Sequence, residues 1–258
     1  MIGLYPGSVD ENWEKEIEDM LRYYSRNPVA IGEIGLDYYY SNETAELQKT
    51  ALKAQFELAS KLNLPVNIHL RDATEDFLKV VKECSHLGLR GNMHAFSGSY
   101  ETFLELQKYG DWSVGIGGVV TFKKAKVAES VGKIPLEKIV LETDAPYLAP
   151  VPMRGKRNES TFIPFIAQKI ADIKGISIEE VAEAASRGGG SVLALAVTVP
   201  KTGWLNGAHG DCSYYADLDI DGEIIAEEMT PQLVFSAADT QKAQAYGIGD
   251  ACTTLAGK

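Results

Sequence analysis

Residues 29–38 read VAIGEIGLDY, an apolar run that ends in carboxylates. A nearly continuous apolar run of this length is typical of a buried strand in a parallel sheet. Glu33 and Asp37 fall where such a strand passes into the following loop. In a barrel of alternating strands and helices, the loops at the carboxyl ends of the strands carry the chemistry. The stretch therefore predicts a buried strand that delivers acidic side chains to a functional site.

Four later stretches have the same form, an apolar run followed by polar, ligand-type side chains. They are PVNIHLRD (65–72), GNMHAFSGS (91–99), DWSVGIGGVVTF (111–122) and KIVLETDAPYL (138–148). The polar side chains that they deliver are His69, Asp72, His94, Ser97, Thr121, Glu142 and Asp144. Five such runs indicate one site assembled from several strand ends.

Helical patterns separate the strands, and this alternation predicts parallel strands joined by right-handed crossovers. The expected strands are Ile2–Tyr5, one from Val29, Val66–Leu70, Asn92–Phe96, Trp112–Gly117 and Ile139–Leu141. The expected helices are one that begins at Ser8 with Glu11 three residues on, then Glu43–Leu62, Ala73–Cys84, Tyr100–Tyr109, Lys123–Val131, Ile163–Lys174 and Ser177–Arg187. The first and last have the Ser-x-x-Glu pattern of a capping box.

The composition is that of an ordinary globular protein, with 45% apolar and 24% charged residues among 258. The net charge of −11 argues against broad electrostatic binding to duplex DNA, although a small phosphate-reading pocket is compatible with it. Three widely spaced cysteines suggest neither a disulfide framework nor a cysteine zinc site. No signal peptide or membrane-spanning run is evident, so we expect no membrane association and a cytoplasmic location.

The composition changes at Arg187. Residues 188–191 read GGGS, which is typical of a flexible linker. Beyond it, alternating runs and an Asp-Gly turn signal indicate β-structure, and residues 191–258 hold 3 Lys against 9 Asp or Glu. We therefore expect a barrel-type unit at 1–187, a linker at 188–191, and a small acidic β-rich segment of unknown function at 192–258.

The combination of Glu33, His69, His94 and Asp144 points to a metal site. A single histidine near a strand end is more often a hydrogen-bonded structural residue. Imidazole together with carboxylate, however, is the ligand set of zinc or a similar divalent ion in a hydrolytic site. Given the barrel, the sequence favours a metal-binding site.

Other polar residues keep two interpretations. Asp37 is either a helix cap or a ligand, and Asp72 either supports the site or caps the next helix. Glu142 is expected to be structural, and Ser97 a loop hydroxyl, because no Gly-x-Ser-x-Gly elbow surrounds it. The cluster of Arg154, Lys156 and Arg157 is either a solvated loop or a phosphate clamp.

Six motifs together carry a resemblance to a known family. GEIGLDYY, IHLRDA, MHAFSGS, GIGGVVTF, LETDAPYLAP and RGKRNES, over residues 1–187, resemble in order and spacing the TatD-like metal-dependent deoxyribonucleases of the amidohydrolase superfamily. The resemblance implies a TIM-barrel fold and metal-dependent hydrolysis of phosphodiester bonds in DNA, from the 3′ towards the 5′ end. It also implies single-stranded DNA or 3′ ends as substrate and Mg, Mn or Zn as the divalent metal.

The resemblance also assigns roles. Glu33 would bridge two metals, His69 and His94 would complete one of them, and Asp144 would bind the other and handle the water proton. Arg71, Arg154 and Arg157 would contact the substrate.

Two departures from the family's pattern change these expectations. The family opens with an Asp-Thr-His-x-His strand that binds the Asp144 metal, and the printed sequence lacks this motif. Where the family usually has Gly-x-His-Pro, this chain has Tyr5 in place of the histidine. We therefore expect an α/β fold that is an incomplete barrel lacking its first strands, with self-association through its open edges. Impaired turnover is expected, and the alternative function is a catalytically inactive metal-binding or structural assembly protein.

Overall fold

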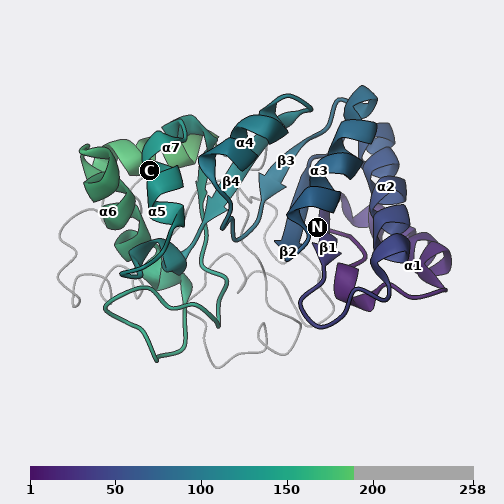
Figure 1. Ribbon diagram of the computed structural model, residues 1–258, viewed down its shortest axis with the longest axis horizontal. Coiled ribbons are helices and arrows are strands. Elements are labelled where there is room, and N and C mark those ends of the chain that lie inside the picture. The colour runs from purple at the N-terminus through teal and green to yellow at the C-terminus, as the bar shows by residue number, and fades with distance from the viewer. Residues whose placement is uncertain (189–258) are drawn as a thin grey trace. The chain divides into compact units, whose positions relative to one another are not determined.

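The computed structural model describes residues 1–188 and shows an α/β protein (Figure 1). The strands follow one another in the sheet in chain order, β1-β2-β3-β4-β5. The chain divides into two compact units, Met1–Gly115 and a second that begins at Ile116. Among the described residues, no helix is both long and apolar enough to cross a membrane. The β-rich segment expected at 192–258 lies outside the described residues, so it and the proposed boundaries at 187 and 191 remain predictions.

The first unit contains four parallel strands with a helix after each of the first three. Its elements are η1 (Pro6–Ser8), α1 (Trp13–Met20), η2 (Leu21–Arg26), β1 (Ile31–Asp37), α2 (Ala45–Leu62), β2 (Val66–Arg71), α3 (Thr74–Glu83), η3 (Ser85–Leu87), β3 (Arg90–Met93), α4 (Tyr100–Gln107) and β4 (Asp111–Ile116). The last residue of β4 already belongs to the second unit. Helices α2 and α3 lie beside β1 and β2, and α1 lies beside α2, in Figure 1.

The core of the first unit explains why these runs become strands. The apolar residues of β1 are fully buried, as are Val66 and Ile68 of β2, Phe56 of α2 and Phe77 of α3. The ring of Phe77 meets Phe56 edge-on at 6.4 Å and Trp112 of β4 at 6.3 Å. A continuous apolar run is stable as a strand where it is covered, and α2 and α3 supply cover by packing against β1 and β2.

The pairing of β1 with β2 fixes the place of the site. Gly35 is paired with His69, and Asp37 with Arg71. Gly35 has a φ of +147°, and a Cβ there would lie 1.8 Å from the carbonyl oxygen of His69. Only glycine allows the two strands to approach this closely at that point.

The first residues of the chain are tied to this unit. Ile2 forms an isolated parallel bridge with Ile31 of β1. Further along, the side chain of Gln55 accepts a hydrogen bond from the amide of Leu4 at 2.7 Å and donates to its carbonyl oxygen at 3.3 Å. An α2 glutamine therefore satisfies the backbone of a segment that has no full strand partner there.

The second unit is described over residues 116–188. Its elements are η4 (Gly118–Thr121), α5 (Val127–Lys133), η5 (Leu136–Lys138), β5 (Ile139–Leu141), η6 (Ser160–Phe162), α6 (Ile163–Lys174) and α7 (Ile178–Gly188). Helix α6 packs against both α5 and α7, and its buried residues include Ile166 and Ile170. The Ser177–Glu180 capping box expected for α7 is present in both directions, with Glu180 Oε2 accepting from the Ser177 amide and Ser177 Oγ accepting from the Glu180 amide.

The predicted alternation of strands and helices is confirmed, but the strand predicted at Ile2–Tyr5 is wrong, because only Ile2 forms a bridge, to Ile31. Several boundaries shift by one or two residues, and three shift by more. The first helix begins at Trp13 rather than Ser8, because Pro6–Ser8 forms a 3-10 turn. The third strand ends at Met93 rather than Phe96, since Ala95 adopts a φ of +46°. The helix expected from Lys123 begins at Val127, after the 3-10 turn Gly118–Thr121.

Candidate functional site

Glu33, His69 and His94 come together at one end of the first three strands. Glu33 lies in β1, His69 lies in β2, and His94 follows the last residue of β3. Oε1 of Glu33 is 3.4 Å from Nδ1 of His69 and 3.6 Å from Nε2 of His94. The His94 side chain is only 4% exposed, so this end of the cluster is shielded from water. One carboxylate oxygen therefore faces two imidazole rings, and the three residues that the sequence grouped lie together; their role as metal ligands stays a prediction.

Asp37 holds His69 from its other side. Oδ2 of Asp37 is 2.8 Å from Nε2 of His69 and accepts a hydrogen bond from the Tyr5 hydroxyl at 3.2 Å. Its Oδ1 accepts from the amide of Tyr39 at 2.9 Å. Asp37 therefore caps no helix, because α2 begins at Ala45 and has Thr44 as its N-cap.

The backbone of Asp37 is held as firmly as its side chain. The side chain of Gln48, in α2, accepts from the Asp37 amide at 2.9 Å and donates to its carbonyl oxygen at 3.1 Å. Gln48 is nearly fully buried. Buried amide side chains that make both hydrogen bonds fix the geometry of the group they hold.

Within the cluster, the carboxylates and His69 stabilise each other's ionised forms. Burial alone would raise the pKa of Glu33, but the contacts with His69 and His94 bring it below its usual value. Burial alone would lower the pKa of His69, but Glu33 and Asp37 raise it above the usual value. Burial would likewise raise the pKa of Asp37, whereas the Tyr39 amide and His69 lower it. Both carboxylates are therefore ionised at neutral pH.

These protonation states define the tautomer of His69. An ionised carboxylate only accepts hydrogen bonds, so Nε2 of His69 must donate to Asp37. In the neutral ring, Nδ1 then presents a lone pair to Oε1 of Glu33, and two electron-rich atoms face each other at 3.4 Å. A proton or a cation between them removes that repulsion.

The donor types fit a divalent ion. Two imidazole nitrogens and one carboxylate oxygen are the ligands of catalytic zinc sites and suit other divalent metals as well. Within residues 1–188, however, no group of three or more His, Cys, Asp or Glu side chains is already arranged to hold a metal ion. To hold an ion, these three side chains would have to turn towards a common point.

Tyr5 stands where the resembling family carries histidine, and its hydroxyl belongs to the same cluster. Its ring meets the His69 ring edge-on, with centroids 5.0 Å apart. Burial and the neighbouring Asp37 raise the pKa of Tyr5 to about 12. The phenol therefore stays protonated at neutral pH and acts as a hydrogen-bond donor rather than an anionic ligand.

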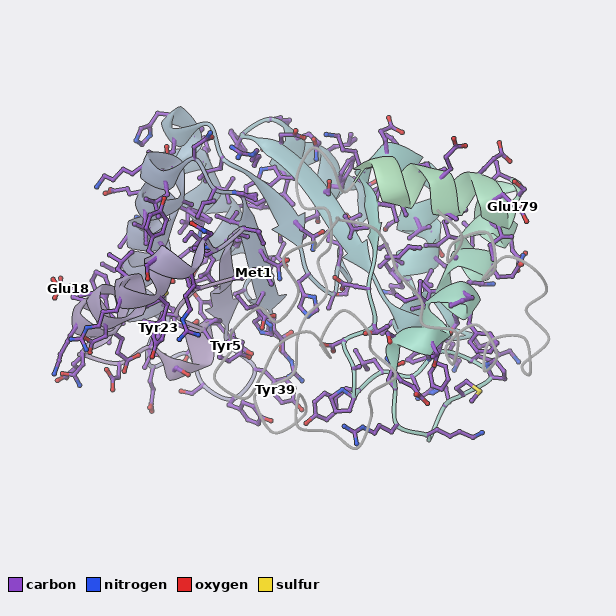
Figure 2. The ribbon with its side chains drawn as sticks, turned by 180° about the vertical axis from the view of Figure 1, so that it is seen from behind. Met1, Tyr5, Glu18, Tyr23, Tyr39 and Glu179 are labelled. Carbon is purple, nitrogen blue, oxygen red and sulfur yellow. The ribbon has the colours of Figure 1, made fainter. Side chains whose placement is uncertain are left out.

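Arg71 lies beyond His69 at the end of β2. Its guanidinium stacks over the ring of Tyr39, 3.4 Å from the ring centroid, and Tyr40 meets the same ring edge-on. Tyr5 and Tyr39 both lie at the end towards which β1 and β2 point (Figure 2). The predicted substrate-binding Arg71 is thus positioned beside exposed aromatic rings.

Asp144 lies in the second unit, in the loop after β5. It has a φ of +56°, and its carbonyl oxygen accepts from the Tyr147 amide at 2.9 Å. The buried Asn158 donates through Nδ2 to the carbonyl oxygens of Thr143, at 2.5 Å, and Tyr147, at 2.6 Å. Asn158 therefore closes the loop that carries Asp144, which the sequence did not reveal.

The structure also shows the surroundings of the other residues that the sequence singled out. Arg154 and Arg157 are exposed, and the guanidinium of Arg154 lies 4.1 Å from the centroid of the Phe122 ring. Glu142 is buried, which agrees with a structural role. Asp72 does not cap α3, whose N-cap is Ala73.

Sequence reasoning missed the residues that hold the site in place. Gln48 and Gln55 lie seven residues apart on the buried face of α2, among apolar residues. Two polar residues repeated on an apolar helical face are a signal that their amides bind something buried. The role of Tyr39 had no such signal, because its amide rather than its side chain contacts Asp37.

Comparison with known proteins places these features in one family. The family described as TatD related DNase matches residues 1–188. A protein of Bacillus subtilis, named as an uncharacterized metal-dependent hydrolase (YabD), is 44% identical over 60% of this chain and 60% of its own length. The chain thus spans less than two thirds of that relative.

Two further relatives also carry the TatD name. The 3′-5′ ssDNA/RNA exonuclease TatD of Pantoea ananatis is 36% identical, over 70% of this chain and 72% of its own. The crystal structure of the TatD homologue YjjV from Escherichia coli superposes with a TM-score of 0.68 at 26% identity, covering 75% of this chain and 76% of that one. With its histidine and carboxylate cluster at the strand ends and a family match over most of its length, the chain belongs to the TatD-related DNase family.

Proposed function

We propose that the protein is a metal-dependent hydrolase that removes nucleotides from the 3′ ends of single-stranded DNA. The observation that carries this proposal is the contact of Glu33 Oε1 with the ring nitrogens of His69 and His94. The 3′-5′ ssDNA/RNA exonuclease name of the Pantoea ananatis relative supports the choice of substrate.

Each residue has a part in this proposal. Glu33, His69 and His94 would hold the divalent ion, which is Mg, Mn or Zn. When bound, such an ion lowers the pKa of coordinated water and polarises a phosphoryl oxygen. Asp37 keeps His69 in the tautomer whose Nδ1 is free to bind, and the neutral Tyr5 hydroxyl donates to Asp37.

The second unit supplies the other proposed groups. Asp144 would bind metal as well and would accept the proton of the attacking water, as a general base does. Arg154 and Arg157 would bind substrate phosphate, because a guanidinium group pairs well with phosphate oxygens. Both arginines are exposed.

The test is hydrolysis of a 5′-labelled single-stranded oligonucleotide in the presence of Mg, Mn or Zn. We expect a ladder of products shortened from the 3′ end, which EDTA abolishes. Asp144→Asn should slow the reaction by roughly 10²- to 10⁴-fold, the usual contribution of a general base. Products shortened from the 5′ end, or a rate unaffected by EDTA, would exclude this function.

A second candidate is a metal-binding protein without turnover. Tyr5 favours it, because a protonated phenol stands at the position where the resembling family carries histidine. Metal that binds and is lost in His94→Ala, together with no hydrolysis of any oligonucleotide, would identify this second function.

A further inference from the structure

The loop between β1 and α2 exposes two tyrosine rings next to the candidate site. Tyr39 is 51% exposed and Tyr40 is 90% exposed. Their ring centroids are 4.8 Å apart and the ring planes are nearly perpendicular. A tyrosine that is almost wholly exposed gains nothing from burial in the fold, so the Tyr40 ring is available to a ligand.

Arg71 stacks on one of these two tyrosines and holds it in place. Its guanidinium covers one face of the Tyr39 ring at 3.4 Å from the centroid. Stacking of a planar cation on an aromatic ring stabilises both side chains in one orientation. Together Arg71, Tyr39 and Tyr40 form a cluster of flat groups, which we call the aromatic platform.

The platform is joined directly to the metal-ligand candidates. The Asp37 carboxylate accepts from the Tyr39 amide through one oxygen and from His69 through the other. Arg71 lies two residues after His69 on β2, so their side chains project from the same face of the strand, about 7 Å apart along it. A group that contacts the platform is therefore near His69.

The chemistry of the platform selects its ligand. Aromatic rings and guanidinium groups stack on nucleobases, and every base offers a suitable face. A base inside a duplex is already covered on both faces, so only an unpaired base can stack there. The chain carries a net charge of −11, so affinity for a polyanion cannot come from a broad basic surface and stacking must supply more of it.

We propose that the aromatic platform stacks on an unpaired nucleobase at the 3′ end of single-stranded nucleic acid and so presents its last phosphodiester bond to the site. This inference rests on the proposed function for the nature of the substrate. The base is held without hydrogen-bond reading of its edge, so the platform accepts all four bases.

The experiment measures binding without turnover. The probe is a single-stranded oligonucleotide with 2-aminopurine as its 3′-terminal base. It is titrated with the intact protein in the presence of EDTA. Stacking on an aromatic ring quenches the fluorescence of 2-aminopurine. We expect quenching with the intact protein, and binding weakened roughly 5- to 150-fold in Tyr40→Leu, the range of base–aromatic stacking. The double variant Tyr39→Leu/Tyr40→Leu should show no quenching.

Tyr23→Leu is the matched control. Tyr23 is 56% exposed and also lies near a guanidinium, that of Arg26 at 5.9 Å, but it belongs to η2 rather than to the strand ends. This variant should bind as the intact protein does. A second probe with an abasic 3′-terminal residue should bind weakly and equally to the intact protein and to Tyr40→Leu.

The outcomes separate the two proposals. Quenching that Tyr40→Leu abolishes, in a protein that hydrolyses nothing, supports the platform and removes the proposed function. Hydrolysis with no quenching, or with equal quenching in Tyr40→Leu and Tyr23→Leu, overturns the platform and leaves the proposed function standing.

Discussion

Oδ2 of Asp37 lies 2.8 Å from Nε2 of His69, on the side of the ring opposite Glu33. A carboxylate in this position fixes the tautomer and the direction of a metal-binding histidine. Asp37 is itself held by Gln48 and by the Tyr39 amide. Asp37, held in this way, thus helps to fix the orientation of His69 from the side opposite Glu33.

Asp37→Asn should weaken divalent metal binding by about 10- to 100-fold, the usual loss when such a supporting carboxylate is removed. The amide can present its NH₂ group to Nε2 and favour the wrong tautomer of His69. Metal affinity is measured by isothermal titration with Mn and with Zn.

The control for this substitution is Asp76→Asn. Asp76 also accepts a hydrogen bond from a tyrosine hydroxyl, that of Tyr38 at 3.2 Å, but it contacts no histidine among the described residues. Its replacement should leave metal affinity unchanged. Equal losses in the two variants would show that Asp37 acts only through general stability.

The ionisation of His69 provides a prediction about pH. Burial lowers the pKa of His69, but the effect of Glu33 and Asp37, which raise it, is larger. In metal-free protein His69 should therefore titrate above about 6.5. Its ion pairs stabilise the fold fully below about pH 6.5, and this contribution is lost as the pH rises through the raised pKa.

The carboxylates behave in the opposite sense. The pKa values of Glu33 and Asp37 are lowered, so their contribution is present above about pH 4 and is lost as the pH falls through the lowered values. An NMR titration of His69 in EDTA checks the first statement. A midpoint at or below 6.5 would mean that the carboxylates do not stabilise the charged ring.

Gly35→Ala should damage the site through the sheet. The added Cβ would lie 1.8 Å from the carbonyl oxygen of His69, at a φ of +147° that alanine rarely adopts. Strands β1 and β2 must then separate where Glu33 and His69 meet. We expect loss of metal binding together with a lower melting temperature. Gly88→Ala is the control, because nothing lies within 4 Å of a Cβ there, although its φ of +61° adds local strain.

The strand runs could be read from the sequence because a parallel strand buried on both faces has a simple apolar signature. Ile139–Leu141 and Ile163–Lys174 have the bounds that the pattern predicted. Local turn chemistry was harder: Ser8-x-x-Glu11 has the form of a capping box, but Pro6 begins a 3-10 turn and the helix starts later.

The site was predictable only in part. The sequence indicates three of the site residues by their type and by their position near strand ends, namely Glu33, His69 and His94. The structure brings these three together. The hydrogen bonds of Asp37 depend on Gln48, eleven residues along the chain, and on Tyr5, thirty-two residues before it. No periodic pattern records contacts between such distant positions.

Gln55→Leu should lower the free energy of unfolding by about 1–3 kcal/mol. The substitution keeps the volume but leaves the amide and the carbonyl oxygen of Leu4 without the partner that Gln55 supplies, and unmade buried hydrogen bonds cost about this much. Urea unfolding measures it. Gln168→Leu, at an exposed position of α6, should change stability by less than about 0.5 kcal/mol. A neutral Gln55→Leu would show that the first residues are not anchored through α2.

The rate of 3′-nucleotide release from single-stranded DNA, compared between the intact protein and Glu33→Gln at saturating Mn, tests the central claim most directly. Glutamine keeps the shape of Glu33 but removes the charge that faces both His69 and His94. We predict that the intact protein releases nucleotides and that Glu33→Gln, although folded, does not. Release at the same rate by both proteins would contradict the assignment of Glu33, His69 and His94 as the centre of this activity.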